Sequence, residues 1–372
     1  MPAKNHHLRN PTPQELIQIR STHQRYWGQH LTLKQYLKRE EILSNTTLTG
    51  NGGLTNWALV DPTTTPATVL ASCESIRKEV FFLEAGSNEV RVSHGHGIGS
   101  VFTPVEMRGK GYASLMLKML REELKSHGGE SALSALYSDI GKVGNISSRA
   151  VSVEKLIFSC PRQEFYKKLG WQPHSSFHLN IPVSPNSSPT IAATKTTPLK
   201  TASLPPLCTQ DIKALKASLT ATPALKSRIS FHPDPKTFDW HFSRAEHLAS
   251  VTNRPPPTTK GAITASGTAW IVWTHDFQKA GPKLHILRVA GEPSKEDAKD
   301  LLAAAVAEAR EWGLACVQVW NPKEAVEEAG EGLGGQMVER TDSVPSIMMY
   351  DPGVGSTVEE VEWFANEKFA WC

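Results

Sequence analysis

The stretch that decides the fold runs from Val101 to Ala113 and reads Val-Phe-Thr-Pro-Val-Glu-Met-Arg-Gly-Lys-Gly-Tyr-Ala. Its first residues are typical of a strand, its glycines of a tight turn, and the apolar spacing that follows predicts an amphipathic helix over residues 111–125. The first N–H groups of a helix have no partner inside the helix, so they face whatever lies over the turn. Because the helix dipole favours an anion there, the stretch predicts a pyrophosphate cradle.

The residue types in this turn fit an anion site. Gly109 and Gly111 let the backbone approach a ligand closely, and Arg108 and Lys110 add positive charge. The spacing differs from a Walker loop and from a dinucleotide fingerprint, since neither G-x-x-x-x-G-K-[ST] nor G-x-G-x-x-G occurs here. The alternative interpretation is a tight strand-to-helix turn with a solvated basic rim.

Length and composition limit the classes of protein to which this chain can belong. At roughly 150 residues per domain, a chain of 372 residues predicts two domains. The 40 basic and 37 acidic side chains give a net charge of +3, so we expect no nucleic-acid partner. Five scattered cysteines without a C-x-x-C pair disfavour a zinc site or a disulfide framework, and we expect no metal. No apolar run approaches the roughly 20 residues that span a bilayer, and no apolar leader is visible, so we expect a cytoplasmic protein without a membrane partner.

The order of the predicted elements indicates an α/β (α+β) protein with two similar domains. In the first, residues 1–181, a helical region broken at Gly28 precedes strands, the cradle helix, a further strand and a further helix. The strands are expected at 55–61, 67–76, 79–83, 97–105 and 133–139, and the last helix at 162–169. Residues 182–206 hold six prolines, nine Ser/Thr and no aromatic residue, which is typical of a linker. The second domain, residues 207–352, repeats the order with strands at 268–273, 284–289 and 315–320 around a helix at 294–312, and an aromatic tail covers 353–372.

A second motif lies downstream of the cradle. Glu164-Phe-Tyr-Lys-Lys-Leu-Gly-Trp171 reads as a helix, a glycine stop and an aromatic residue that opens a strand. Together the two motifs resemble the GNAT N-acetyltransferase superfamily: Arg108-x-x-Gly111-x-Ala113 matches its [RQ]-x-x-G-x-[GA] signature, and Phe165-Tyr166-x-Lys168-x-Gly170-Trp171 matches the segment that closes its site. Short segments resemble one branch, the fungal lysine N-acetyltransferases of lysine catabolism. These segments are Leu33–Glu40, Leu70–Glu74, Gly97–Pro104, Leu136–Gly141, Gly261–Ile263, Trp270–Thr274 and Leu284–Arg288.

The resemblance implies a GNAT fold, a mixed central sheet flanked by helices, with acetyl-CoA as co-substrate. The end of the strand before the cradle is then expected to hold the pantetheine and the thioester carbonyl, and the turn to hold the pyrophosphate. The implied cofactor-binding residues are Val101, Phe102, Thr103, Arg108, Gly109, Lys110, Gly111, Tyr112, Ala113 and Ser114. Both reactants are held for direct transfer, without a covalent enzyme intermediate.

The resemblance also implies that Tyr166 is the general acid that protonates the departing thiolate. The attacking amine must be neutral, and a lysine amine with a pKa of about 10.4 is neutral to only about 0.1% at pH 7.5, so a base is expected. Asp139 is one candidate, because it ends the strand after the cradle helix. His94, His96 and the terminal carboxylate of Cys372 are alternatives, although lone histidines are more often structural.

Three further segments shape the expectations. At the corresponding turn of the second domain, Glu292, Glu296 and Asp297 would repel a pyrophosphate, so we expect one cofactor per chain and a second domain that shapes the acceptor site. Residues 142–161 depart from the family pattern and are either a lineage-specific loop or an artefact of the gene model. The aromatic tail either docks on the surface or enters the active-site cleft.

The function expected from this resemblance is acetylation of the ε-amine of free L-lysine. The same chemistry on a polyamine, another amino acid or a protein lysine is the alternative. A non-catalytic acyl-CoA-binding protein is a third interpretation, which the presence of both the cradle and Tyr166 disfavours.

Overall fold

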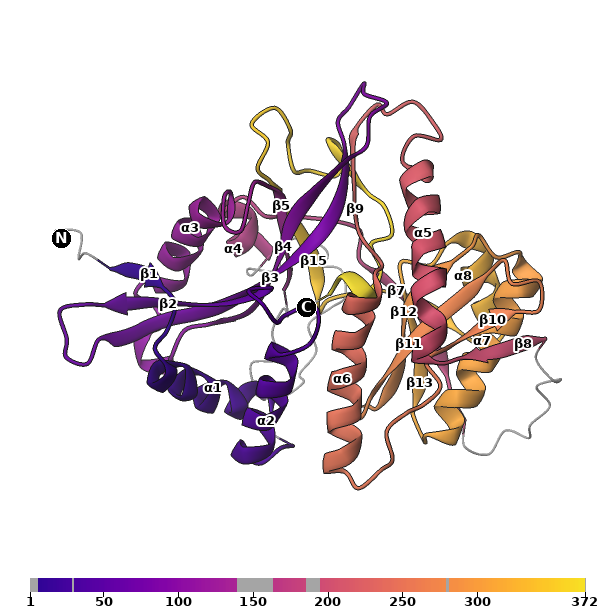
Figure 1. The fold of residues 1–372 in the computed structure, drawn as a ribbon, viewed down its shortest axis with the longest axis horizontal. Coiled ribbons are helices and arrows are strands. Elements are labelled where there is room, and N and C mark those ends of the chain that lie inside the picture. Colours follow the sequence, from indigo (N-terminus) through magenta and orange to yellow (C-terminus); the bar gives the residue numbers. More distant parts are fainter. Residues whose placement is uncertain (1–5, 29, 139–162, 185–194, 279–280, 372) are drawn as a thin grey trace, which may run out of the picture.

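The computed structural model describes residues 6–28, 30–138, 163–184, 195–278 and 281–371, which form two mixed sheets flanked by helices (Figure 1). The strands are β1 (His7–Arg9), β2 (Leu54–Asp61), β3 (Thr68–Leu83), β4 (Arg91–Phe102), β5 (Ser131–Ser138), β6 (Gln172–Pro173), β7 (Phe177–Pro182), β8 (Thr196–Leu199), β9 (Ser227–Phe231), β10 (Gly261–Thr264), β11 (Trp270–Asp276), β12 (Lys283–Ala290), β13 (Cys316–Trp320), β14 (Gln336–Glu339), β15 (Val344–Met349) and β16 (Val361–Trp363). The helices are α1 (Pro13–Trp27), α2 (Leu33–Ser44), α3 (Tyr112–Leu124), α4 (Gln163–Lys168), α5 (Leu204–Ser218), α6 (Pro235–Val251), α7 (Lys295–Glu311) and α8 (Glu324–Glu331).

The first sheet has the order β1-β2-β3-β4-β5-β15-β6, and β9 pairs with both β3 and β16. Side chains alternate between the faces of a strand, so neighbouring positions of β2 serve different helices. Trp57 and Leu59 pack with α3, whereas Ala58 and Val60 pack with Ile19 of α1. Helices α1 and α3 therefore cover opposite faces of this part of the sheet (Figure 1).

The predicted break between the first two helices is confirmed. A capping box at Thr12 starts α1, a second at Thr32 starts α2, and α1 ends at Gly28. A β-carbon at Gly28 would lie 2.2 Å from the ring of Tyr36, so the close approach of the two helices requires glycine there.

The second sheet has the order β14-β7-β13-β12-β11-β10-β8. Its centre contains the predicted unit. Strands β11 and β12 form a hairpin, β12 and β13 pair in parallel, and α7 connects β12 to β13 along the chain. Strand β7 lies between β13 and β14 in this sheet, whereas β15 lies between β5 and β6 in the first. The first sheet thus includes β9, β15 and β16 from the second half of the chain, the second sheet includes β7 from the first half, and sheet membership does not follow the predicted boundary at residue 181.

One hydrophobic core joins the two sheets. It combines Val80 and Ile347 of the first sheet with Val272 and Leu287 of the second. Leu199 and Leu204 are also buried in it, because residues 195–206 hold β8 and the start of α5 where the sequence analysis expects linker. Residues 185–194 of that stretch lie outside the described part of the chain.

The predicted break between two strands at residues 76–79 is wrong. Strand β3 is continuous, although Arg77 and Lys78 interrupt its apolar pattern. Lys78 is buried, and its Nζ donates a hydrogen bond of 2.9 Å to the carbonyl oxygen of Ala370. A contact 292 positions along the chain satisfies this ammonium, and local sequence pattern could not reveal it.

Candidate active site

The first feature of the site is the point where β4 and β5 diverge. Their parallel pairing runs from His94 and Ser131 to Ile98 and Leu136, and β4 then continues to Phe102. Where β4 pairs with its antiparallel neighbour β3, it carries a bulge: Ser72 and Glu74, two residues apart on β3, pair with Phe102 and Gly99, three residues apart on β4. Ser100, inside the bulge, has a φ of 53°, which is in the left-handed region. The strand end is therefore turned away from its parallel neighbour.

The predicted cradle follows directly. Gly109 and Gly111 have φ values of 76° and 80°, and a β-carbon on either would meet nothing within 4 Å. Helix α3 starts after Gly111 without a side-chain cap and without an acidic residue in its first turn, which holds Tyr112, Ala113 and Ser114. The turn thus offers uncapped helix donors and open space, as an anion requires.

The cations of the cradle are held by the backbone. Arg108 Nε donates to the carbonyl oxygen of Thr103 at 3.1 Å, and its guanidinium lies 5.7 Å from the ring centre of Phe102. Lys110 Nζ donates to the carbonyl oxygen of Glu106 at 3.0 Å. The hydroxyl of Thr103 is buried and has no hydrogen-bond partner among the described residues. The strand end therefore carries an unsatisfied polar group where the pantetheine is expected, so these residues fit the co-substrate.

Tyr166 lies on α4 and is half-buried. It packs against the hydrophobic cluster that also receives Val101 from β4 and Tyr112 from α3. The fold thus brings the predicted general acid, the strand end and the cradle helix to one cluster. Asp139, the predicted base, and the insertion 142–161 lie outside the described residues, as does Cys372.

The two histidines that were alternatives for the base lie in the paired part of β4, before the point where β4 and β5 diverge. His96 is six positions before the strand end, which corresponds to about 20 Å at 3.3 Å per residue. It pairs with Ser131 at 3.0 Å, and burial lowers its pKa to about 4. His94 precedes it by two further residues. The bulge at the end of β4 lies beyond both histidines.

Sequence reasoning missed a carboxyl group that lies beside the bulge. Ser100 Oγ donates a hydrogen bond of 2.7 Å to Glu74 on β3, on the face of the sheet opposite α3. Burial, assisted by the charge of Glu40, raises the pKa of Glu74 to about 7, although Ser100 and nearby arginines oppose the shift. A small pocket lined by Glu74, Ser100, Glu40, Arg20 and His23 opens at this point. A carboxyl group that titrates near neutral pH at the strand end is suited to accept a proton from an amine.

Helix α1 supplies most of the helical lining of this pocket, and α2 adds Glu40. Arg39 is buried and forms an ion pair of 2.8 Å with Glu40, while its guanidinium lies 4.4 Å from the ring centre of Tyr36. Glu40 and Glu74 end two of the segments that carry the family resemblance, which was the signal in the sequence. What the sequence lacked was the contact between α2 and β3.

The tail reaches the same region. Phe369 is buried in the shared core, and Trp371 packs against the cluster that contains Leu43 of α2, Ile76 of β3 and Trp240 of α6. Ile76 is two residues from Glu74 on β3. The described part of the tail therefore lies between the two halves, near the pocket beside Glu74.

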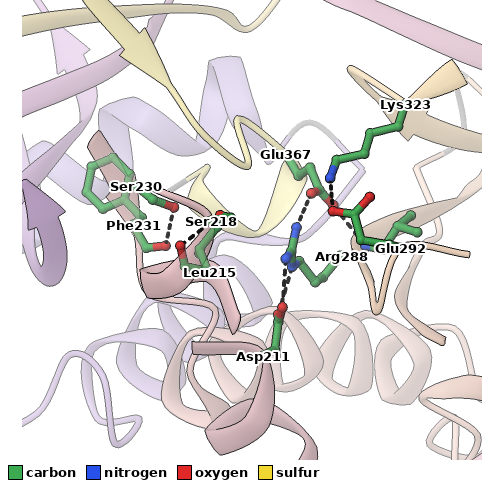
Figure 2. A network of polar contacts seen from close by, with 10 residues as sticks. Asp211, Leu215, Ser218, Ser230, Phe231, Arg288, Glu292, Lys323 and Glu367 are labelled. Atoms are coloured by element: carbon green, nitrogen blue, oxygen red, sulfur yellow. Dashed lines mark hydrogen bonds and ion pairs between the residues drawn. The ribbon is translucent and has the colours of Figure 1, made fainter. Parts of the chain in front are cut away.

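The corresponding place in the second half looks different. Figure 2 shows Arg288 of β12 held between Asp211 and Glu367, with hydrogen bonds of 2.7 and 2.8 Å to Asp211 and an ion pair to Glu367. The other oxygen of Glu367 accepts the backbone N–H of Val289 at 2.8 Å. Glu292, in the turn that follows, forms an ion pair with Lys323. Side chains of this chain therefore occupy the strand end.

Comparisons with known proteins agree with this geometry. Residues 178–372, more than half of the chain, match the family model described as the LYC1 GNAT-like C-terminal domain. The chain belongs to this family. Over nearly its whole length this LYC1-like chain is also similar to a protein named lysine acetyltransferase from Yarrowia lipolytica, with 24% identity over 403 aligned positions that cover 97% of this chain and 98% of the relative.

Solved structures show the same fold. A probable N-acyltransferase from Enterococcus faecalis V583 has a TM-score of 0.53 at 12% identity, over 93% of this chain and 72% of that one. A GCN5-related glucosamine N-acetyltransferase region of a fungal multi-domain GH3 β-N-acetylglucosaminidase has a TM-score of 0.51 at 10% identity, over 94% of this chain and 38% of that one. The predicted GNAT fold, with a second GNAT-like half, is thus confirmed, and the chain is an N-acetyltransferase.

Membrane-spanning helices and metal-binding clusters are both absent from the described ranges. No helix within them is both long and apolar enough to cross a membrane. The same residues contain no group of three or more His, Cys, Asp or Glu side chains that could hold a metal ion.

Proposed function

We propose that this chain transfers an acetyl group from acetyl-CoA to the ε-amine of free L-lysine in lysine catabolism. The observation that carries the proposal is the position of Glu74: a carboxyl group with a pKa near 7 lies beside the bulge at the end of β4. The choice of lysine is supported by the name of the Yarrowia lipolytica relative, lysine acetyltransferase. Acetyl-CoA supplies the acetyl group and a thiolate leaving group.

In this proposal acetyl-CoA and the acceptor amine bind on opposite faces of the first sheet. The cradle on the α3 side holds the pyrophosphate through the N–H groups of residues 109–114, assisted by Arg108 and Lys110. The end of β4, from Val101 to Thr103, holds the pantetheine and the thioester. The acceptor amine enters from the opposite face, where α1 and α2 lie over Glu74.

The residues of this chain then move two protons. Glu74 takes one from the attacking ammonium, directly or through a water molecule, because its pKa lies near the working pH. Tyr166, on α4, gives one to the departing thiolate. Both reactants are held at the diverging strands, so acetyl transfer proceeds without a covalent enzyme intermediate.

The test is release of CoA by the purified full-length chain with acetyl-CoA and a panel of amines: L-lysine, L-ornithine, spermidine and a lysine-bearing peptide. We expect turnover with free L-lysine far above that with the others, and mass spectrometry should place the acetyl group on the ε-amine. Preferred turnover of spermidine or the peptide would contradict the proposed acceptor. Tight binding of CoA without turnover of any amine would contradict the enzymatic function.

A further inference from the structure

Arg340 lies where the chain crosses from the second sheet to the first, between β14 and β15. Only 3% of its surface is exposed. Ser176 holds it twice: the carbonyl oxygen accepts the backbone N–H of Arg340 at 2.6 Å, and the hydroxyl oxygen accepts a hydrogen bond of 3.1 Å from Nε. The guanidinium carbon lies 3.7 Å from the ring centre of Trp320 on β13. These contacts fix the orientation of the guanidinium.

Two of the three guanidinium nitrogens of Arg340 lack a partner. Nη1 and Nη2 carry four of the five N–H donors of the side chain, and both are buried without a hydrogen bond to any described residue. Burial lowers the pKa of Arg340 to about 10, and the charges of Tyr137 and Asp342 oppose the shift. Because a buried charge without a partner is costly, this cation is placed for an anion that the described part of the chain does not supply.

Two other buried arginines differ from Arg340 in this respect. Arg228 forms an ion pair of 2.8 Å with Glu362, and Arg288 forms one of 2.7 Å with Asp211. Their exposed fractions are 5% and 7%, which is no less burial than fold stability allows a paired arginine here. Arg340 is buried at least as deeply, so the lack of a carboxylate beside it sets it apart.

The groups around Arg340 suit a small organic anion. A second cation, Lys368 of the tail, lies 4.3 Å from the ring centre of Trp320. The ring centre of Tyr137 lies 6.2 Å from those of Trp320 and Trp363. The indole Nε1 of Trp363 is buried and donates to no described residue. The cluster therefore combines positive charge and an unused N–H donor with aromatic rings that can cover an apolar group.

This cluster is separate from the pocket beside Glu74, whose lining residues lie between Leu16 and Ser100. It lies near the diverging strands, because Tyr137 directly follows Leu136, the last residue of β5 that pairs with β4. Side chains alternate along a strand, so Tyr137 faces away from α3, against which Leu136 packs, and toward the core shared with the second half. The cluster thus lies on the face of β5 opposite α3.

A carboxylate matches the planar fork of a guanidinium with two parallel hydrogen bonds, and a stacked indole leaves the N–H edge open for them. We propose that Arg340 and Trp320 form a binding site for a small carboxylate at the junction of the two sheets. The carboxylate belongs either to the acceptor amino acid or to a separate small molecule, and the recognition chemistry is the same for both. Binding at Arg340 does not depend on the proposed acetyl transfer, so either can fail alone.

The test titrates the full-length chain with sodium acetate at constant ionic strength, with sodium chloride as the matched salt. Acetate should raise the melting temperature and change the tryptophan fluorescence in a saturable way, because a ligand stabilises the fold that binds it. Arg340→Met should abolish both responses, and Arg340→Lys should raise the Kd for acetate by about 10-fold, since an ammonium cannot make the paired contact. The control is Arg91→Met, an exposed arginine whose guanidinium carbon lies 4.8 Å from the ring centre of Phe82; it should leave acetate binding unchanged.

Kinetics distinguish the two sources of the carboxylate. If it belongs to the acceptor, acetate should compete with L-lysine, and Arg340→Met should raise KM for lysine by about 10-fold or more but leave KM unchanged for cadaverine, which lacks the carboxylate. If it belongs to a separate molecule, acetate and Arg340→Met should both leave KM for lysine unchanged. Either result supports a carboxylate site at Arg340, provided that acetate binds there.

Two results would overturn the site: equal binding of acetate by the wild type and Arg340→Met, or a response of the wild type to acetate no larger than that to chloride. If Arg340→Met does not fold, the Kd of Arg340→Lys decides, and an unchanged value would contradict the proposal. A chain that binds acetate through Arg340 but acetylates no amine would overturn the proposed function and leave the carboxylate site standing.

Discussion

Two strand–helix–strand units of this chain share a backbone arrangement and differ in the side chains that surround the end of the first strand. In the first half β4 and β5 stop pairing after Ile98, and in the second β12 and β13 stop after Ile286. Both β4 and β12 carry one extra residue relative to the preceding strand just after this point. The second half has therefore kept the diverging strands and the bulge of a GNAT site.

The helices after these strands begin in opposite ways. Helix α3 starts at Gly111 without a side-chain cap, whereas α7 starts at Ser294 with a capping box closed by Asp297. The N–H of Val289 on β12 is bound by Glu367 of the tail. In the second half, side chains of the chain already bind the groups that a pyrophosphate or a pantetheine would need.

The turn that follows Tyr166, the proposed general acid, has a counterpart in the second half. Backbone N–H groups of Leu169 and Trp171 both donate to the carbonyl oxygen of Tyr166, and those of Leu333 and Gly335 both donate to that of Gly330. Gly330 thus stands where the first half has its tyrosine, and a β-carbon there would lie 2.2 Å from the side chain of Leu179. The second half thus has a GNAT-like backbone in which packing at Gly330 and the cap at Ser294 stand in place of the side chain and the open helix start proposed to act in the first half.

The largest effect is expected at Tyr166. Tyr166→Phe removes the proposed proton donor and should lower kcat by about 100- to 10,000-fold with little change in the affinity for CoA. The matched control is Tyr350→Phe, a tyrosine whose hydroxyl bonds Ser134 and whose ring packs against the same cluster. Steady-state CoA release measures both. Full activity of Tyr166→Phe would remove the functional difference between Tyr166 and Gly330.

The next effect concerns Glu74. Because the carboxylate form accepts the proton, activity of the wild type should rise with pH through about 7. The groups that face Glu74 are Arg20 and His23 from α1, Arg39 and Glu40 from α2, and Ser100 from β4, besides Cys73 on its own strand.

Glu74→Gln should lower kcat/KM at pH 7 by about 100-fold, and the loss should shrink at high pH, where more of the amine is neutral. The control Glu79→Gln changes an exposed carboxylate further along β3 and should leave the pH profile unchanged. A Glu74→Gln profile parallel to that of the wild type would exclude Glu74 as the base.

A smaller effect is expected at Arg108 and at Arg288, the arginines at the corresponding places of the two halves. Arg108→Ala should weaken CoA binding by about 10-fold, the value of one charge-assisted contact. Arg288→Met should leave the affinity for CoA unchanged but destabilise the fold by about 3–5 kcal/mol, since it leaves Asp211 and Glu367 without their cation. Calorimetry and urea unfolding measure these two quantities. Weaker CoA binding by a folded Arg288 variant would indicate that the second half does take part in binding.

The smallest effect is that of the α7 cap. Ser294→Ala should lower the free energy of unfolding by about 1 kcal/mol, as for other lost N-caps, and leave CoA binding unchanged. Urea denaturation gives the first number and calorimetry the second. A gain of CoA binding in this variant would show that the cap had been blocking a latent site.

The sequence predicts the parts of the molecule that depend on local pattern. The cradle, α1 and α2, and the β12–α7–β13 unit follow from glycine placement, capping residues and apolar spacing. Strand β9 is buried at all five positions and shows no alternation, so the sequence analysis missed it. The exchange of β7 and β15 between the sheets has no local signature at all.

The acceptor side of the site follows the same rule. Tyr166 and Arg108 could be predicted from the sequence, because each lies in a short motif that resembles the family pattern. Glu74 could not, because it acquires its surroundings from other elements, Ser100 of β4 and Glu40 of α2. The raised pKa of this carboxyl group depends on contacts that exist only in the folded chain.

The central claim is that the first half holds the co-substrate and the second half has closed the equivalent place. Calorimetric titration of the full-length chain with CoA tests it most directly. We predict one CoA per chain, and loss of that binding in Gly111→Asp, which puts a carboxylate into the cradle. A stoichiometry of two, or unchanged binding by the Gly111 variant, would contradict the account.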